Sequence, residues 1–541
     1  MRIALVNEGT YPVVKGGVST WCDQLIRQLD EHEWHVVTLV GEERTPVWPA
    51  PAPLASTTLV PLWDPVRRRL AGPAVRRRRR EVADALDLLW RSVLPASGAA
   101  APELTGFRAA LQVLAQRSRI SLAQFLQDSS SFEPMLAAWA DHSAARPGLP
   151  PLTVAQAALA AQAADRTLAV VDARWPEVDL VNASANGASA LVAMARLWED
   201  GTPFVLSEHG VYLRERYLAL DAVGWDWSVR YVTMAFTRAL CELAYREAMF
   251  VAPVNRFNSR WECRLGADPA KIVPIPNGVD PEAFPAVSGE PEGPVVSFVG
   301  RIDPLKDLAT MIEAFAIVRA EIPDARLRLF GPTPPTNRAY RAGLEDLVTS
   351  LGLDDAVVFE GPAPSARPAI EAGQVVALSS ISEGLPFTVI EAMMSGRPTV
   401  NTDVGGVAEV TGPDGVAAMV VPPRDPAAFA LALVDLLRDA PRRARMGAAA
   451  RTRMLAEFSE PVFVHRYRHL YEAMAARRPV DFVELGIEPL AAASNDARFR
   501  SIVDALPNLP ELADALDGHP GDAGVPGDAV EARAMPGGGG A

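Results

Sequence analysis

The stretch PVVSFVGRIDPLKD, residues 294–307, combines a short apolar run, a glycine and a basic loop. Residues 294–299 have the length and composition of a strand that is covered on both faces. Similar segments follow, with helical patterns between them: ARLRLFG (325–331), AVVFEG (356–361), VVALSS (375–380), PTVNT (398–402) and AAMVV (417–421). This alternation predicts an α/β domain with a doubly wound parallel sheet, whose ligand site lies at the carboxyl ends of the strands.

The beginning of the chain has the same rhythm. It predicts a strand at 2–7 (RIALVN), a loop containing Gly16 and Gly17, a helix near 18–29 and a second strand at 34–40. Further strands are expected at 178–184, 202–210 and 249–254. Residues 45–165 interrupt this pattern and predict a mostly helical insertion. We therefore expect two Rossmann-like doubly wound domains that face a central cleft, with the insertion in the first.

Changes in composition give approximate boundaries for these domains. The Pro/Gly-rich stretch 281–294 is a linker, so we place the first domain at 1–285 and the second at 290–458. A closing helix at about 459–475 is a candidate to pack back on the first domain. Residues 476–541 form an extension, which the run of Gly, Pro, Asp and Ala predicts to be disordered beyond about 516.

The bulk composition excludes several function classes. The chain has 541 residues, and its 52 Lys+Arg against 66 Asp+Glu give a net charge of -14, which argues against general nucleic-acid binding. We expect a cytoplasmic protein because no signal peptide or apolar run of ~20 residues is present. Cys22, Cys241 and Cys263 lack CxxC spacing, and the seven histidines lack HExxH spacing. These patterns predict neither a disulfide framework nor a bound metal.

The most informative motif is ISEGLPFTVIEAMMSGRP, residues 381–398. Glu383 lies in the loop after a predicted strand, and a helix beginning near Pro386 places Glu391 in its second turn. The free amides of that helix would point toward the Glu383 loop, and carboxylates accept paired hydrogen bonds from sugar hydroxyls. Taken singly, Glu383 is equally explained as an acid near a helix N-terminus and Glu391 as a solvated helix residue.

A second motif, GRIDPLKD at 300–307, follows the first strand of the second domain. Gly300 allows a turn, and the guanidinium of Arg301 and the ammonium of Lys306 suit a diphosphate. Such a basic pair can replace a metal ion. Alone, these charges would be interpreted as the solvated flank of a helix.

Together the two motifs resemble the donor site of family 4 retaining glycosyltransferases, which have the GT-B fold. The resemblance rests on Gly300-Arg301, Lys306, Glu383 and Glu391, and PNGVD (276–280) matches an interdomain segment of that family. It implies a metal-independent hexosyltransferase without a tightly bound cofactor. Arg301 and Lys306 would bind the donor diphosphate and Glu391 the ribose.

The resemblance also assigns the residues around the transferred sugar. Glu383 would bind this sugar, assisted by the backbone amides of Gly384 and Leu385. Gly16 and Gly17 would form a loop close to phosphate or acceptor, although for this pair alone a plain tight turn is the better interpretation.

In Ser207-Glu208-His209-Gly210, the imidazole of His209 would lie near the reaction centre, where otherwise a buried core histidine would be expected. The family's mechanism retains the anomeric configuration, with the leaving phosphate helping to deprotonate the acceptor. The run Arg214-Glu215-Arg216 either contacts an acceptor or forms a solvated helical face.

Within the family the chain is most similar to PelF-like enzymes of Pel exopolysaccharide synthesis, through EGTYPVVKGGVSTW (8–21), SEHGVYLRER (207–216) and SISEGLPFTVIEAM (380–393). This similarity implies a UDP-sugar donor, such as UDP-glucose or a related UDP-hexose, and a growing polysaccharide as acceptor. Partners would be inner-membrane polysaccharide synthesis proteins, with the enzyme peripheral to them. Residues 360–374 depart from the family pattern, so a GDP- or ADP-sugar stays open.

Other interpretations compete with this one. A non-catalytic nucleotide-sugar-binding scaffold in a membrane complex would keep the donor motifs. A NAD-dependent oxidoreductase or epimerase is disfavoured because no GxGxxG follows the strands at 2–7 and 294–299. The run RRRLAGPAVRRRRR (67–80) either contacts anionic lipid or an acidic partner, or is a solvated part of the insertion.

Overall fold

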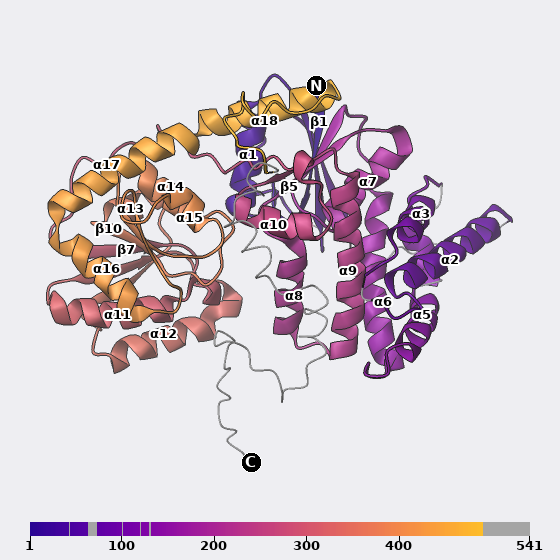
Figure 1. Ribbon diagram of the computed structural model, residues 1–541, viewed down its shortest axis with the longest axis horizontal. Helices are drawn as coiled ribbons and strands as arrows, with labels where there is room; N and C mark the ends of the chain where they lie inside the picture. Colours follow the sequence, from indigo (N-terminus) through magenta and orange to yellow (C-terminus); the bar gives the residue numbers. More distant parts are fainter. Residues whose placement is uncertain (43, 63–72, 100, 119–120, 129–130, 491–541) are drawn as a thin grey trace, which may run out of the picture.

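Two six-stranded parallel sheets form the framework of the protein in a computed structural model (Figure 1). The structure describes residues 1–490 except 43, 63–72, 100, 119–120 and 129–130. Helices flank each sheet. Along the chain, strands and helices alternate in both domains, as the sequence predicts. The expected pair of doubly wound domains is therefore confirmed.

The first sheet has the strand order β3-β2-β1-β4-β5-β6, and all its neighbours are parallel. Its strands are β1 (Arg2–Glu8), β2 (Glu33–Val40), β3 (Leu54–Pro61), β4 (Leu180–Ala183), β5 (Phe204–Glu208) and β6 (Phe250–Pro253). The helices between them are α1 (Gly17–Gln28), α7 (Ala188–Asp200), α8 (Tyr212–Val223) and α9 (Trp227–Glu247), and α10 (Arg256–Arg264) follows β6. Strands β4, β5 and β6 are buried throughout because helices cover both faces.

The second sheet has the order β12-β11-β10-β7-β8-β9. Its strands are β7 (Val295–Val299), β8 (Arg326–Phe330), β9 (Val357–Gly361), β10 (Val375–Leu378), β11 (Thr399–Thr402) and β12 (Met419–Val421). Its helices are α11 (Leu308–Glu321), α12 (Arg338–Ser350), α13 (Ala366–Glu371), α14 (Phe387–Met394), α15 (Val407–Thr411), α16 (Pro426–Arg438) and α17 (Ala440–Glu457). From β7 the strand order proceeds to one edge of the sheet through β8 and β9, and from β10 to the other edge through β11 and β12. Because β7 and β10 are parallel neighbours, the loops that follow them lie next to each other.

The predicted insertion needs one correction, because it does not begin at residue 45. Residues 54–61 form β3, which pairs with β2 at the edge of the first sheet. Its side chains are half-buried or exposed, so the segment lacks the apolar run that marks an interior strand. The prolines at 51, 53 and 61 lie near its ends, where an edge strand tolerates them.

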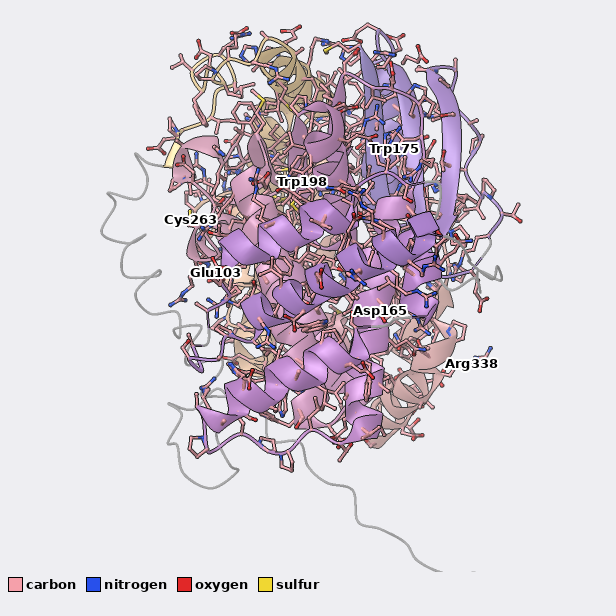
Figure 2. The ribbon with its side chains drawn as sticks, turned by 90° about the vertical axis from the view of Figure 1, so that its right-hand side faces the viewer. Glu103, Asp165, Trp175, Trp198, Cys263 and Arg338 are labelled. Carbon is pink, nitrogen blue, oxygen red and sulfur yellow. The ribbon has the colours of Figure 1, made fainter. Side chains whose placement is uncertain are left out.

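The remainder of the insertion is helical, as expected. Its helices are α2 (Pro73–Val93), α3 (Leu104–Leu114), α4 (Leu122–Asp128), α5 (Phe132–Ala144) and α6 (Val154–Leu168). Figure 2 faces these helices, with the labelled Glu103 and Asp165 among them. The carboxylate of Glu103 caps α3 by accepting hydrogen bonds from the amides of Thr105 (2.9 Å) and Gly106 (2.7 Å).

Part of the arginine cluster has a structural role. The guanidinium of Arg78 donates to the carbonyl oxygens of Val113 (2.9 Å) and Leu114 (3.3 Å), and so joins α2 to the end of α3. Arg77 is 86% exposed and pairs with Glu81 on its own helix. Residues 67–72 of the cluster lie outside the described residues.

Helix α18 (Glu460–Ala475) returns from the second domain and packs on the first sheet (Figure 1). The hydroxyl of Tyr467 donates to the Ser207 hydroxyl (3.1 Å), and the amide of Asn182 donates to the Tyr471 hydroxyl (2.6 Å). Both tyrosines are fully buried, so this helix fixes one side of the first domain.

The chain after α18 continues along the first domain to residue 490, where Val480, Leu485 and Ile487 are buried. Residues 491–541, including the stretch expected to be disordered beyond about 516, lie outside the described residues. Of the helices within the described ranges, none combines the length and apolar composition needed to cross a bilayer.

Candidate active site between the two sheets

An ion pair joins the two predicted motifs. Lys306 ends a short 3-10 helix after β7, and Glu383 lies in the loop after β10. Because β7 and β10 are neighbours, their loops meet, and the Lys306 ammonium lies 2.5 Å from Oε1 of Glu383. The two side chains are 21% and 11% exposed. The two residues are 77 positions apart in the sequence, and the pairing of β7 with β10 brings them together.

The two loops are also tied together through their backbones. The amide of Ile381 donates to the carbonyl of Leu305 (2.9 Å), and the Ser379 hydroxyl donates to the carbonyl of Lys306 (2.8 Å). The Ser380 hydroxyl donates to the same Oε1 of Glu383 that Lys306 contacts (2.6 Å). The basic and acidic loops therefore form one preorganised unit.

Glu391 lies on α14, as predicted, and differs from Glu383 in having no partner. Within the described part of the chain, no side chain forms a hydrogen bond with its carboxylate. Burial raises the pKa of Glu391 to about 7. A half-buried acid without a partner is available for a ligand that donates hydrogen bonds.

Arg301 stands apart from the other predicted residues. Its side chain is 65% exposed, and its nearest carboxylate is that of Asp303 at 3.8 Å. Gly300 before it lies under Gly331, where a Cβ on Gly331 would be 1.7 Å from the Gly300 carbonyl oxygen. The turn is therefore tightly constrained, while the arginine side chain is largely exposed to solvent.

The acidic loop contacts the first domain directly. A Cβ on Gly384 would lie 2.3 Å from the carbonyl oxygen of His209. The carbonyl of Gly384 accepts hydrogen bonds from the amide of Gly406 (2.9 Å) and from Nδ2 of Asn255 (2.8 Å). Sequence patterns did not indicate Asn255, although it follows β6 at the same edge of the sheet as His209.

Asn277 and Leu385 make a second contact between the domains. Nδ2 of Asn277, in the predicted interdomain segment PNGVD, donates to the carbonyl of Leu385 (3.4 Å). The first-domain glycine loop lies nearby: a Cβ on Gly17 would be 3.5 Å from the ring of Phe387, the first residue of α14. A Cβ on Gly16 would meet nothing within 4 Å.

His209 packs edge-on against Trp21, with ring centroids 4.7 Å apart. Burial lowers the pKa of His209 to about 4, so the imidazole is neutral at pH 7. Among the described residues its Nε2 has no hydrogen-bond partner. The ring borders a cavity of about 350 Å³ that is also lined by Glu8, Tyr212 and Arg216.

Two residues of the predicted run Arg214-Glu215-Arg216, Glu215 and Arg216, line that cavity. Arg216 donates to Glu8 (3.3 Å) and to the Tyr212 hydroxyl (2.6 Å), while its side chain stays 48% exposed, so it is both hydrogen-bonded and partly solvated. Arg214 instead reaches the second domain and donates to the Ser382 hydroxyl (2.8 Å). Of the two arginines of this run on α8, Arg214 thus contacts the second domain and Arg216 contacts residues of the first domain.

Glu208, the residue before His209, and Glu262 form a pair of buried carboxyls that sequence analysis did not indicate. Glu208 ends β5 and Glu262 lies on α10. The Tyr245 hydroxyl donates to Glu208 (2.7 Å). Burial raises the pKa of Glu208 to about 7, and burial together with Glu208 raises the pKa of Glu262 well above its usual range. Glu208 and Glu262 lie in separate predicted elements, and nothing in the sequence around either residue indicates that they pair.

The carboxyl pair makes stability depend on pH. An unfolded glutamate loses its proton near pH 4.5, whereas Glu208 keeps it to about pH 7 in the folded chain. The free energy of unfolding therefore falls as pH rises between these values. We expect Glu208→Gln to stabilise the protein at pH 8 by on the order of 2 kcal/mol and to change little at pH 4, because glutamine removes the group that must lose its proton. Urea denaturation at both pH values measures this, with exposed Glu282→Gln as control. A variant that is no more stable than the parent at pH 8 contradicts the assignment.

The second domain matches a known family. Residues 293–439 match the family described as glycosyl transferases group 1. They form a group 1 glycosyl transferase domain. Residues 1–270, which carry the first sheet and the insertion, match the family described as domain of unknown function DUF3492. The glycosyl transferase match contains Arg301, Lys306, Glu383 and Glu391, and so covers both motifs of the predicted donor site.

Curated relatives that match part of the chain are glycosyltransferases. A D-inositol 3-phosphate glycosyltransferase of Kineococcus radiotolerans is 36% identical over 211 residues, which are 35% of this chain and 48% of the relative. An MMP alpha-(1->4)-mannosyltransferase of Mycolicibacterium hassiacum is 27% identical over 58% of this chain and 74% of the relative. The chain spans about half the length of the inositol phosphate relatives it matches.

Solved glycosyltransferase structures share the whole architecture. Anabaena HepE in complex with UDP and glucose has a TM-score of 0.54 and 15% identity, over 87% of this chain and 99% of HepE. Sucrose-phosphate synthase from Thermosynechococcus elongatus has a TM-score of 0.57 and 19% identity, over 88% of this chain and 99% of the synthase. The group 1 domain and its partner therefore have the expected GT-B fold.

Proposed function

We propose that the protein is a retaining glycosyltransferase that transfers a hexose from a UDP-sugar to a saccharide acceptor. The observation that carries this proposal is the placement of Lys306 and Glu383 in contact at the edge of the second sheet, with unpartnered Glu391 on the adjacent helix. A diphosphate needs cations, whereas sugar hydroxyls need acceptors. Both kinds of group occur here, on the domain that belongs to glycosyl transferases group 1.

In this proposal Lys306 and the exposed Arg301 bind the donor diphosphate. Arg301 is exposed and has only a distant carboxylate, so it can turn to the ligand at little cost. Together the two cations neutralise the charge that develops on the leaving nucleotide, in the role that a metal ion plays elsewhere. In the described residues, no three His, Cys, Asp or Glu side chains are grouped to hold a metal ion.

The two glutamates bind the hydroxyl-bearing parts of the donor. Glu391 accepts hydrogen bonds from the ribose, and Glu383 binds the transferred sugar when the Lys306 ammonium moves to phosphate. The amides of Gly384 and Leu385 assist there, and Gly16 and Gly17 approach the phosphates from the first domain. Uridine is the proposed base because HepE, a structure of the same fold, binds UDP and UDP-glucose.

The acceptor is proposed to occupy the cavity of about 350 Å³ beside His209. A neutral imidazole can exchange hydrogen bonds with a sugar hydroxyl without introducing a charge. The leaving phosphate then takes the proton of the attacking hydroxyl, so the chain needs no nucleophile of its own. The first domain is thus the acceptor domain and the second the donor domain.

The biological acceptor that we propose is a growing exopolysaccharide of the Pel type. Its support is the sequence similarity to PelF-like enzymes in residues 8–21, 207–216 and 380–393. A peripheral association with inner-membrane polysaccharide synthesis proteins follows from that similarity. A scaffold that binds nucleotide sugar without catalysis is the alternative, and it would lack both transfer and donor hydrolysis.

Donor binding should depend on pH through Glu391. Because the pKa of Glu391 in the free protein is about 7, the carboxylate that accepts ribose hydroxyls forms only above that pH. We expect UDP-glucose to bind about tenfold more tightly at pH 8 than at pH 6, since about ten times more of the acid is ionised. Titration calorimetry measures this. Glu391→Gln should bind weakly at both pH values; a parent protein without pH dependence contradicts the role.

The proposed function is tested by donor selectivity and product stereochemistry. Melting temperatures with UDP, GDP and ADP should rise most with UDP, because a ligand stabilises the folded state that binds it. Hydrolysis of the matching nucleotide sugar, followed by proton NMR before mutarotation, should yield the retained anomer. An inverted product overturns the retaining mechanism. Absence of hydrolysis and transfer with every nucleotide sugar supports the scaffold.

A further inference from the structure

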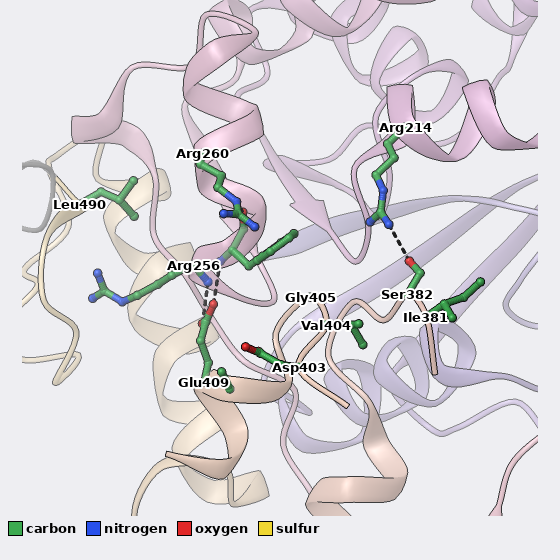
Figure 3. Close-up of a pocket in the computed structure, with 12 residues that line it drawn as sticks. Arg214, Arg256, Arg260, Ile381, Ser382, Asp403, Val404, Gly405, Glu409 and Leu490 are labelled. Carbon is green, nitrogen blue, oxygen red and sulfur yellow. Dashed lines mark hydrogen bonds between the residues drawn. The ribbon is translucent and has the colours of Figure 1, made fainter. Parts of the chain in front are cut away.

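A second pocket lies between the domains, on the side of α8, α10 and α15 (Figure 3). Its volume is about 590 Å³, which suits a sugar-sized ligand. The first domain contributes Arg214, Arg260 and Phe257, and the second contributes Ser382 and the loop after β11. None of these residues belongs to the donor or acceptor positions proposed above.

Two guanidiniums face this pocket without acidic partners. Arg214 donates to the Ser382 hydroxyl, and Arg260 donates to the carbonyl of Phe257 (3.1 Å). Among the described residues, neither forms an ion pair. Burial lowers the pKa of both guanidiniums, although Glu215 offsets part of this for Arg214 and Glu409 part of it for Arg260. The charge of Arg214 also lowers the pKa of Arg260. The two cations therefore repel each other across space that an anion would fill favourably.

The nearby carboxylates offset the charge of this pair only in part, since Glu409 raises the pKa of Arg260 but forms no ion pair with it among the described residues. Glu409 accepts hydrogen bonds from the backbone amides of Arg256 (2.7 Å) and Phe257 (2.6 Å). Its carboxylate is therefore bound to the N-terminus of α10. Asp403 is exposed and forms no ion pair within the described ranges. In Figure 3 Arg214 and Arg260 point into the same space above Asp403.

The walls of the pocket suit the face of a sugar ring. The Arg260 guanidinium lies over Phe257, 3.4 Å from the ring centroid, and Ile381 and Val404 add apolar surface. An acidic group held by the two arginines would leave its sugar against these apolar side chains, with hydroxyls directed to Asp403.

We propose that this pocket binds a saccharide unit bearing one phosphate or carboxylate group, which Arg214 and Arg260 hold between the domains. The site goes beyond the proposed transfer reaction and does not depend on it. It adjoins the donor loop, since Ser382 contacts Arg214 while the next residue, Glu383, contacts Lys306. An anionic saccharide bound here would therefore join the first domain to the loop that holds the donor sugar.

The test is titration calorimetry of the full chain with glucose 6-phosphate and with glucuronate, using glucose as the neutral control. We expect one of the acidic probes to bind at a single site and glucose to bind at least tenfold more weakly. The probe that binds distinguishes a phosphate from a carboxylate as the recognised group.

Variants locate the binding site. The double variant Arg214→Ala/Arg260→Ala should lose at least tenfold in affinity, and Arg260→Lys should retain part of it because the charge remains. Arg77→Gln, an exposed arginine of α2, and Arg301→Ala in the donor loop should bind like the parent. Circular dichroism melts verify that each variant folds.

Three results would overturn the proposal. The first is a parent protein that binds neither acidic probe. The second is a double variant that binds as tightly as the parent. The third is loss of binding in Arg301→Ala alone, because the anion would then occupy the donor site. UDP affinity, measured separately on the same variants, tests the proposed function and keeps the two failures distinct.

Discussion

Replacing Lys306 with alanine should lower the rate of sugar transfer by about 10²–10³-fold. The ammonium lies at the junction of the two loops that carry the donor site, 2.5 Å from Glu383. Its loss removes the cation proposed to stabilise the leaving diphosphate, and it leaves Glu383 with the Ser380 hydroxyl as its remaining described partner. The effect should fall mainly on kcat, because the charge develops in the transition state.

Lys271→Ala is the matched control for this experiment. The ammonium of Lys271 donates to the backbone carbonyls of Arg246 (3.2 Å) and Ala248 (3.3 Å) in the first domain, away from the proposed donor site. Its removal should leave kcat within about threefold of the parent. Transfer by Lys306→Ala at a similar rate would show that Lys306 does not act on the donor phosphates.

Gly384→Ala should reduce activity at least about 100-fold while the protein remains folded. The new Cβ would lie 2.3 Å from the His209 carbonyl oxygen, a distance that no side-chain movement relieves because that atom is backbone. The glutamate loop would have to withdraw from the first domain. Donor and acceptor are proposed to meet across this contact. Even a small movement of the two domains apart should therefore prevent the reacting atoms from approaching each other.

Gly343→Ala provides the comparison for this glycine. Gly343 lies on α12, and a Cβ there meets nothing within 4 Å. Alanine is favoured over glycine within a helix by about 0.5–1 kcal/mol, so this variant should be slightly more stable and fully active. Normal transfer by Gly384→Ala would mean that the two domains need not close at His209.

Much of the fold was predictable from local pattern, because buried parallel strands are short apolar runs. Residues 294–299, 325–331 and 375–380 contain β7, β8 and β10, and Glu391 lies on α14 as its spacing from Pro386 indicated. Strand β3 was missed because an edge strand buries few side chains and lacks that pattern.

Contacts between distant segments were less accessible to sequence reasoning. The sequence predicts that Lys306 and Glu383 lie at the same sheet edge, but not that they touch. Arg214 meets Ser382 across 168 residues, and the buried carboxyl of Glu208 on β5 interacts with that of Glu262 on α10. Such pairs depend on helix placement and on how the domains meet, which no local spacing encodes.

Calorimetric titration of UDP into the full-length protein tests the central claim, a nucleotide-sugar site built from the two motifs of the second domain. We predict saturable binding at one site per chain, weakened at least about tenfold by Arg301→Ala and by Glu391→Ala. Equal affinity of the parent and both variants for UDP, or no binding by the parent, would contradict the account.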